Sequence, residues 1–201
     1  MKKLLFVLLA VPLLLVLVSC GSEDPAPSNN IIGIASLTAE QQEILDLLSV
    51  PNSQEVMIFD FKTDDSFRRV EFWVEVYANG ELVNRPAGLT TVLDTADSQS
   101  GLLAVTISRT PHYRWTLSAV SGSTRSSHVS SSEAKVNPAL ARAVGSIDEQ
   151  VVIEDRKEII LHSALFTDGS ISIYDHKTLQ ERPELLNEYL YAHIIKCMFS
   201  T

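Results

Sequence analysis

RVEFWVEVYANG, residues 69–80, alternates apolar and polar side chains over ten positions and then ends in Asn-Gly. Strict alternation of this length is typical of a half-buried antiparallel strand, because successive side chains point to opposite faces. Phe72 and the valines share the apolar face, whereas Trp73 and Tyr77 lie among charged residues on the other face. Asn79-Gly80 favours a type I′ turn, which needs positive φ at both positions. The sequence therefore predicts a strand over 69–78 that runs directly into a hairpin.

Short segments with strand character continue on both sides of this hairpin. The segment 55–62 (EVMIFDFK) precedes it, and turn residues separate the later segments. The later predicted strands cover 89–94, 102–109, 112–120, 150–154 and 158–166, with a tight turn at 110–111 and a second hairpin from Asp168-Gly169 into a strand over 170–174. Two stretches keep alternatives open. The serine-rich stretch 121–132 fits an exposed loop or a weak edge strand, and 189–199 fits a helix or, as we favour, a strand.

Helical signals are few. Thr38 and Gln41 have the spacing of a capping box, apolar residues follow, and Pro51 ends the segment. This pattern predicts one helix over 38–49, and a short helical turn is expected over 183–187. Long helices alternating with strands are absent from the pattern, so a parallel α/β sheet is disfavoured. We therefore expect a mainly β chain: an antiparallel β-sandwich, immunoglobulin-like or barrel-like, with one short N-terminal helix and a single domain over 37–201.

The first twenty residues have a different character. Lys2 and Lys3 precede an apolar run over 4–18, which is too short to span a membrane comfortably and is typical of a signal-peptide core. The run ends in Leu-Val-Ser-Cys, with the cysteine at Cys20 and a glycine after it. This order resembles the lipobox of bacterial lipoprotein precursors. The resemblance covers residues 1–20 only, and it implies a cleaved leader over 1–19 and lipidation of Cys20.

Two acyl chains on Cys20 would supply the membrane affinity that one chain lacks, since each buried methylene contributes roughly 0.8 kcal/mol. Residues 20–36 are then expected to hold the lipidated cysteine and a polar tether. The alternatives are an ordinary cleaved signal peptide with a chance cysteine, or an uncleaved membrane anchor. The lipoprotein reading places the chain on the outer side of the cell membrane or in the outer membrane.

Charge and cysteine content exclude several classes of protein. The formal net charge is −9, from 16 basic and 25 acidic residues, and cleavage after residue 19 removes two lysines and leaves −11. Such a chain lacks the clustered cations that bind a phosphate backbone, so no nucleic-acid partner is expected. Two cysteines rule out a disulfide-rich scaffold. With Cys20 lipidated, Cys197 is expected to be a small buried side chain.

Motifs for catalysis and cofactors are sparse. No G-x-S-x-G or phosphate-binding glycine loop occurs, and His193 with Cys197 gives only two of the ligands that a metal needs. We therefore expect no cofactor and no metal. The one candidate surface combines Trp73 and Tyr77 with the basic residues Arg69 and Arg114 on polar strand faces, where a sugar ring or a protein could dock. The alternative is that this face is covered and Trp73 belongs to the core.

The sequence favours a lipid-anchored extracytoplasmic binding or interaction module of the bacterial cell envelope. Its expected partners are the membrane, through the anchor, and an envelope protein or a glycan. The alternative is an envelope hydrolase that uses the carboxylates Asp60, Glu71 and Glu75 on strand faces. No family is recognised for the mature domain from its sequence.

Overall fold

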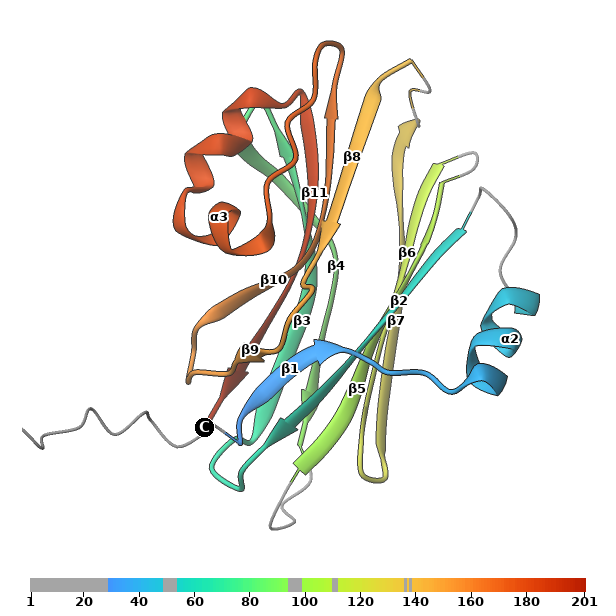
Figure 1. Ribbon diagram of the computed structural model, residues 1–201, viewed down its shortest axis with the longest axis vertical. Coiled ribbons are helices and arrows are strands. Elements are labelled where there is room, and N and C mark those ends of the chain that lie inside the picture. Colours follow the sequence, from blue (N-terminus) through green and yellow to red (C-terminus); the bar gives the residue numbers. More distant parts are fainter. Residues whose placement is uncertain (1–28, 49–53, 94–98, 110–111, 136, 138) are drawn as a thin grey trace, which may run out of the picture.

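The protein is a sandwich of two antiparallel sheets (Figure 1). The computed structural model describes residues 29–48, 54–93, 99–109, 112–135, 137 and 139–201. The strands are β1 (Ile31–Ile34), β2 (Gln54–Thr63), β3 (Arg69–Ala78), β4 (Glu81–Val92), β5 (Gln99–Ser108), β6 (His112–Ser121), β7 (Thr124–Lys135), β8 (Ala141–Ser146), β9 (Val151–Val152), β10 (Glu158–Thr167) and β11 (Tyr191–Ser200). The helices are α2 (Ala39–Leu48), α3 (His176–Glu181) and the 3-10 helix η1 (Pro183–Glu188).

Strands distant in the sequence lie side by side in both sheets. The six-stranded sheet has the order β7-β6-β5-β2-β1-β9, and the five-stranded sheet has the order β4-β3-β11-β10-β8. The last strand, β11, occupies the centre of the five-stranded sheet between β3 and β10. That sheet is therefore complete only when the C-terminal strand is in place. The predicted antiparallel sandwich is confirmed.

Alternation places one face of each strand in the shared core. Phe72 of β3, Phe59 of β2 and Trp115 of β6 are fully buried between the sheets. Phe199 of β11 meets Phe61 edge to face, with ring centroids 5.1 Å apart. Cys197 is also fully buried in this core, as predicted, and burial raises the pKa of its thiol. The core therefore rests on aromatic and branched side chains from both sheets.

The predicted elements around the first hairpin are confirmed. β3 spans 69–78 as predicted, and Asn79 and Gly80 have φ of 49° and 79°, as a type I′ turn requires. The capping box of α2 forms: the amide of Thr38 donates to the side chain of Gln41 at 2.9 Å, and the amide of Gln41 donates to the Thr38 hydroxyl at 3.2 Å. Residues 189–199 form a strand, and the serine-rich stretch forms the edge strand β7.

Four predictions differ from the structure. The segment 170–174 is not a strand, because β10 is already paired on both sides, with β11 and with β8. It leads instead into α3, whose N-cap Asp175 accepts a hydrogen bond from the amide of Thr178. β4 begins at Glu81 and not near residue 89, and its Pro86 is tolerated because β4 is an edge strand.

The folded body also begins earlier than expected. Ile31–Ile34, which we placed in the tether, pairs with β2 and β9 as β1. β8 was missed because its short sequence, ARAVGS, has little strand character. The lipobox and the leader lie outside the described residues, as does the predicted turn at 110–111. Within the described residues, no helix is long and apolar enough to cross a membrane.

The outer face of the five-stranded sheet is partly covered. Leu179 of α3 and Leu185 and Leu186 of η1 pack on Leu165 and Ile194 in a second apolar cluster. Figure 1 shows this helical segment on the side of the sheet that faces away from the six-stranded sheet. The space between the two sheets is open at the end where β11 begins, and this opening positions the candidate site.

Gly101 offers a direct test of the packing between β5 and its neighbours. A Cβ at this position would lie 2.3 Å from the backbone oxygen of Val120 and 2.4 Å from the ring of Phe61. We expect Gly101→Ala to lower the free energy of unfolding by about 1–3 kcal/mol, measured by urea denaturation. Gly169→Ala is the control, because nothing lies within 4 Å of its Cβ position. Equal stability of the two variants would contradict this packing.

Candidate functional site

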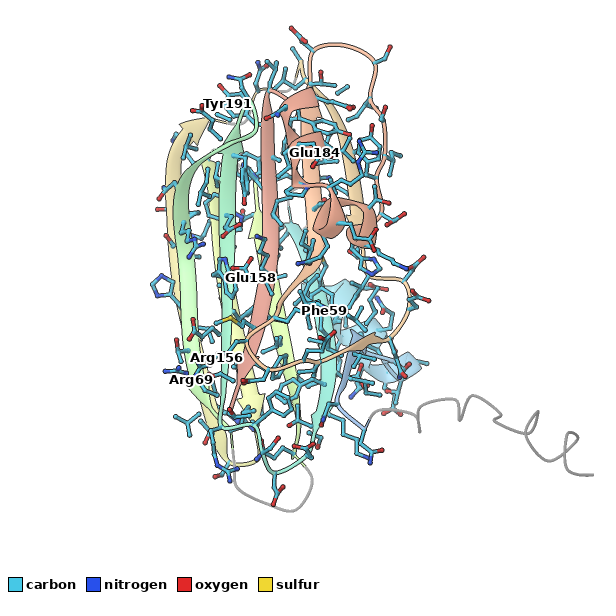
Figure 2. All side chains as sticks on the ribbon, turned by 90° about the vertical axis from the view of Figure 1, so that its left-hand side faces the viewer. Phe59, Arg69, Arg156, Glu158, Glu184 and Tyr191 are labelled. Carbon is cyan, nitrogen blue, oxygen red and sulfur yellow. The ribbon has the colours of Figure 1, made fainter. Side chains whose placement is uncertain are left out.

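A cavity of about 460 Å³ opens at one end of the sandwich, between the two sheets. Its walls come from the end of β3, the first half of β4, the start of β6, the end of β10 and the start of β11. Tyr191, which lines the mouth and is half exposed, lies near one end of the molecule, whereas Arg69 lies toward the other (Figure 2). Asn84 and Asn137 add polar groups to the lining.

Four aromatic side chains form the inner part of this cavity. Tyr113 and Trp115, two residues apart on the inward face of β6, stack with their ring planes 12° apart and their centroids 5.7 Å apart. The ring of His193 meets Tyr113 at 4.5 Å and Trp115 at 5.5 Å, both edge to face. Phe166 lies 5.2 Å from His193. We call Tyr113, Trp115, Phe166 and His193 the aromatic cavity group.

His193 is uncharged at neutral pH. Its side chain is 8 % exposed, and burial lowers its pKa to about 4, with the positive charge of Arg142 acting in the same direction. A neutral imidazole has one N–H donor and one acceptor nitrogen. Within the described residues, neither these nitrogens nor the hydroxyl of Tyr113 has a hydrogen-bond partner. The two rings thus lie with their centroids 4.5 Å apart, and their polar atoms line the cavity without a protein partner among the described residues, accessible from the cavity whereas the Trp115 indole nitrogen is fully enclosed.

An ion pair joins the two sheets beside the cavity. Glu55 of β2 accepts a hydrogen bond from Arg142 of β8 at 2.6 Å and lies 3.4 Å from Arg109. Burial alone would raise the pKa of Glu55, but the hydrogen bond and charge of Arg142 outweigh it and lower that pKa. The Arg142 guanidinium also lies 6.0 Å from the ring centre of Phe166. This ion pair thus lies next to Phe166, one of the residues that line the cavity.

A second inward-facing histidine pairs with a serine. The Ser146 hydroxyl lies 2.8 Å from Nδ1 of His162, its partner in the β8–β10 register. Burial lowers the pKa of His162 to about 4. A catalytic base works best with a pKa near the working pH, so this imidazole is a poor activator of a serine nucleophile. The pair is best described as a buried cross-strand hydrogen bond.

The four residues of the predicted binding face do not share a surface. Arg69, Trp73 and Tyr77 lie on the outer face of β3, whereas Arg114 is exposed on β6 in the other sheet. Trp73 is only 8 % exposed, with the Arg85 guanidinium 5.7 Å from its ring centre. Because Trp73 is buried, the structure offers no open stacking platform at this residue.

Glu75 holds both outer aromatic residues, the buried Trp73 and the partly buried Tyr77. This carboxylate is 1 % exposed and accepts hydrogen bonds from the Trp73 indole at 3.0 Å and the Tyr77 hydroxyl at 2.6 Å. It also pairs with Lys196 at 2.9 Å and Arg85 at 2.7 Å. Burial would raise its pKa, but these contacts outweigh burial and lower the pKa to about 2. The polar atoms of Trp73 and Tyr77 are thus engaged by one internal ion-pair network.

The carboxylates of the alternative hydrolase do not converge. Asp60 is exposed on β2 in the six-stranded sheet, and Glu71 pairs with Arg69 at 3.6 Å. Glu75 on the same strand as Glu71 is four residues away, about 13 Å along the strand. Among the described residues, no group of three or more His, Cys, Asp or Glu side chains is arranged to hold a metal ion.

The aromatic cavity group was missed at the sequence level. His193 was considered only with Cys197 as an incomplete metal site, and Tyr113 was not singled out within the strand predicted over 112–120. The available signal was a polar residue in an inward-facing row: His193 shares its strand face with Ile195, Cys197 and Phe199. Such a row predicts burial, but it does not show that the opposite sheet leaves a space there.

The two buried histidines predict a pH dependence of stability. Their pKa values, about 4 in the folded chain, lie below the ordinary 6.5, so the unfolded chain binds more protons between these limits. As the pH falls from about 6.5 toward 4, each histidine therefore lowers the free energy of unfolding by up to about 1.4 kcal/mol for each pH unit. Urea denaturation between about pH 7 and pH 5 measures this slope.

His193→Phe should reduce the slope, whereas His128→Phe should leave it unchanged because His128 is exposed on β7. An unfolding free energy that is level across this interval in the parent chain, or equal slopes in the parent chain and His193→Phe, would contradict the neutral buried state of His193.

Comparison with known proteins adds one finding. The model of a family described as the YgaN domain matches residues 31–199, from the first residue of β1 to the next-to-last residue of β11. The match therefore covers both sheets and the cavity, and it corrects our failure to recognise a family for this part of the chain. No curated protein and no solved structure matches the chain.

Proposed function

The chain belongs to the YgaN domain family, and we propose that it is a lipid-anchored extracytoplasmic binding module of the bacterial cell envelope that takes its ligand in the aromatic cavity. The observation that carries the proposal is the cavity itself. It is open at one end and has about 460 Å³ of space, and it is lined by Tyr113 and His193, whose accessible polar atoms have no hydrogen-bond partner in the described part of the chain. Apolar hollows with a few convergent polar groups are the usual form of small-ligand sites.

The position of the N-terminal segment supports an anchor at one end of the sandwich and a cavity mouth at the other. Asn30, just before β1, accepts a hydrogen bond from the amide of Asp64 at 2.6 Å and donates to its carboxylate at 2.8 Å. Asp64 follows β2 at the end of the sandwich where β11 finishes, and Tyr191 starts β11 at the other end. Ten residues of strand separate these ends by about 33 Å. An anchor at Cys20 would therefore attach near one end, and the cavity would open at the other.

The size of the cavity limits the ligand. A space of about 460 Å³ admits a small molecule or a single group of a larger partner, such as one unit of a glycan or one side chain of an envelope protein. The acidic net charge would keep the domain off an anionic membrane surface and leave the mouth accessible. The proposed site of action is the outer side of the cell membrane or the outer membrane.

The two cysteines of the chain provide a matched test of the anchor. We expect Cys20→Ala to release the full-length protein from the membrane fraction or to leave it as unprocessed precursor, because the acyl chains have no attachment point. Cys197→Ala removes a buried thiol and should leave fractionation unchanged. Mass spectrometry of the N-terminal peptide identifies the acyl groups. Membrane retention and processing of Cys20→Ala equal to those of the parent would overturn the anchor.

The cavity is tested by native mass spectrometry of protein purified from its own envelope. We expect the parent protein to carry a bound small molecule and Val76→Trp, which fills the cavity, to lack it. Val152→Trp is the control, because Val152 is exposed on β9, away from the cavity. Equal ligand content in the two variants, or no bound molecule in the parent, would count against a binding function for this cavity.

A further inference from the structure

We infer that the ligand of this cavity is an uncharged molecule with a flat apolar body and one hydroxyl-like hydrogen-bonding group, which His193 and Tyr113 hold together. The inference rests on the proposed function, since it assigns the chemical class of what the cavity binds. Three features carry it: the unpartnered polar atoms, the aromatic walls, and a lining whose described residues include no charged side chain.

The polar atoms define the hydrogen-bonding group. His193 is 8 % exposed and Tyr113 is 7 % exposed, and neither has a side-chain hydrogen bond within the described residues. These polar atoms are accessible from the cavity, so a ligand that covers them without hydrogen-bonding to them would leave them unsatisfied, which is unfavourable. A hydroxyl can donate to the imidazole acceptor and accept from the Tyr113 hydroxyl, so one ligand group satisfies both residues.

The walls define the body of the ligand. Tyr113 and Trp115 stack with nearly parallel planes, and Phe166 is tilted on the other side of His193. Aromatic rings prefer offset-stacked or edge-to-face contacts with other rings, which add to the gain from burying apolar area. A flat ring system that packs against the cavity side of these rings therefore suits the site better than a flexible chain of the same area, which would lose more conformational entropy.

The residues that line the cavity indicate the charge of the ligand. No Asp, Glu, Lys or Arg is among the described residues that line this cavity. His193 is neutral at physiological pH because its pKa is lowered to about 4. Arg142 approaches the far side of Phe166, but its charge is engaged by Glu55 at 2.6 Å. A charged ligand would lose its hydration without a counter-ion in the wall, and that loss is unfavourable.

Three probes of one shape test the inference: naphthalene, 2-naphthol and 2-naphthoate. Their dissociation constants are measured by ligand-detected NMR titration of the parent protein. We expect 2-naphthol to bind about tenfold more tightly than naphthalene, the effect of one well-formed hydrogen bond, and 2-naphthoate to bind no more tightly than naphthalene. The ratio of the naphthalene to the 2-naphthol dissociation constant isolates the polar contact from burial of the ring.

Single-group variants identify the partners. Tyr113→Phe removes only a hydroxyl and His193→Phe removes both imidazole nitrogens, so each should bring this ratio toward one while naphthalene still binds. Tyr174→Phe is the matched control: its hydroxyl bonds to Glu188 at 2.9 Å on the exposed outer side, and the ratio should remain about tenfold. Tyr113→Phe keeps the test decisive if His193→Phe fails to fold.

Several results would overturn the inference. Three outcomes would show that the ligand is not an uncharged molecule whose polar group His193 and Tyr113 bind. They are a ratio of one in the parent, a ratio unchanged in both cavity variants, and tightest binding of 2-naphthoate. If naphthalene binds in such a case, the cavity keeps its binding function and only the ligand class is wrong. Failure of all three probes also overturns the ligand class, and the native mass measurement then decides separately whether the cavity binds anything.

Discussion

Inward-facing side chains from two sheets share one narrow space, and every other feature of the molecule depends on how that space is filled. Along most of the sandwich the inner rows are apolar and interlock, as Phe61 and Phe199 do at 5.1 Å. Toward one end the same rows present His193 and Tyr113. Polar side chains do not fill the space between the sheets as densely as the apolar rows do, and the sandwich stays open at this end. The cavity is thus a consequence of the same alternation that builds the core.

Burial has two different outcomes for polar groups in this fold. On the outer face of β3, the carboxylate of Glu75 is almost fully enclosed, yet Trp73, Tyr77, Arg85 and Lys196 all contact it. Removing any one partner from such a network is expected to cost stability, since a buried charge would lose part of its compensation. In the cavity the indole nitrogen of Trp115 is enclosed without a partner among the described residues, and the accessible polar atoms of His193 and Tyr113 also have no protein partner there. Satisfied networks stabilise a fold, and unsatisfied ones indicate where a ligand completes it.

The sequence predicts the fold well where the pattern is local. The alternation of 69–78, the Asn79-Gly80 turn and the Thr38–Gln41 capping box all form as expected. The prediction from sequence fails where pairing between distant strands decides whether a segment becomes a strand. The segment 170–174 has strand character, but β10 has no free edge to pair with it. Strand β1 is too short to be recognised without its partners β2 and β9.

The candidate site was not predictable from one strand at a time. Trp73 and Tyr77 stand out in the sequence because they interrupt a charged row, yet the Glu75 carboxylate between them draws both into a closed network. The cavity residues Tyr113 and His193 come from strands about eighty positions apart and meet only across the two sheets. Their sequence neighbours are those of ordinary core residues. Which inward-facing residue borders an open space depends on the opposite sheet, and that information is absent from local pattern.

The most direct measurement is a crystal structure of the mature protein purified from its native envelope. The account predicts electron density for a flat organic molecule inside the sandwich, with a polar atom within hydrogen-bond distance of both His193 and the Tyr113 hydroxyl. A cavity closed by rearranged side chains, or one in which His193 and Tyr113 bond to other protein groups, would contradict it.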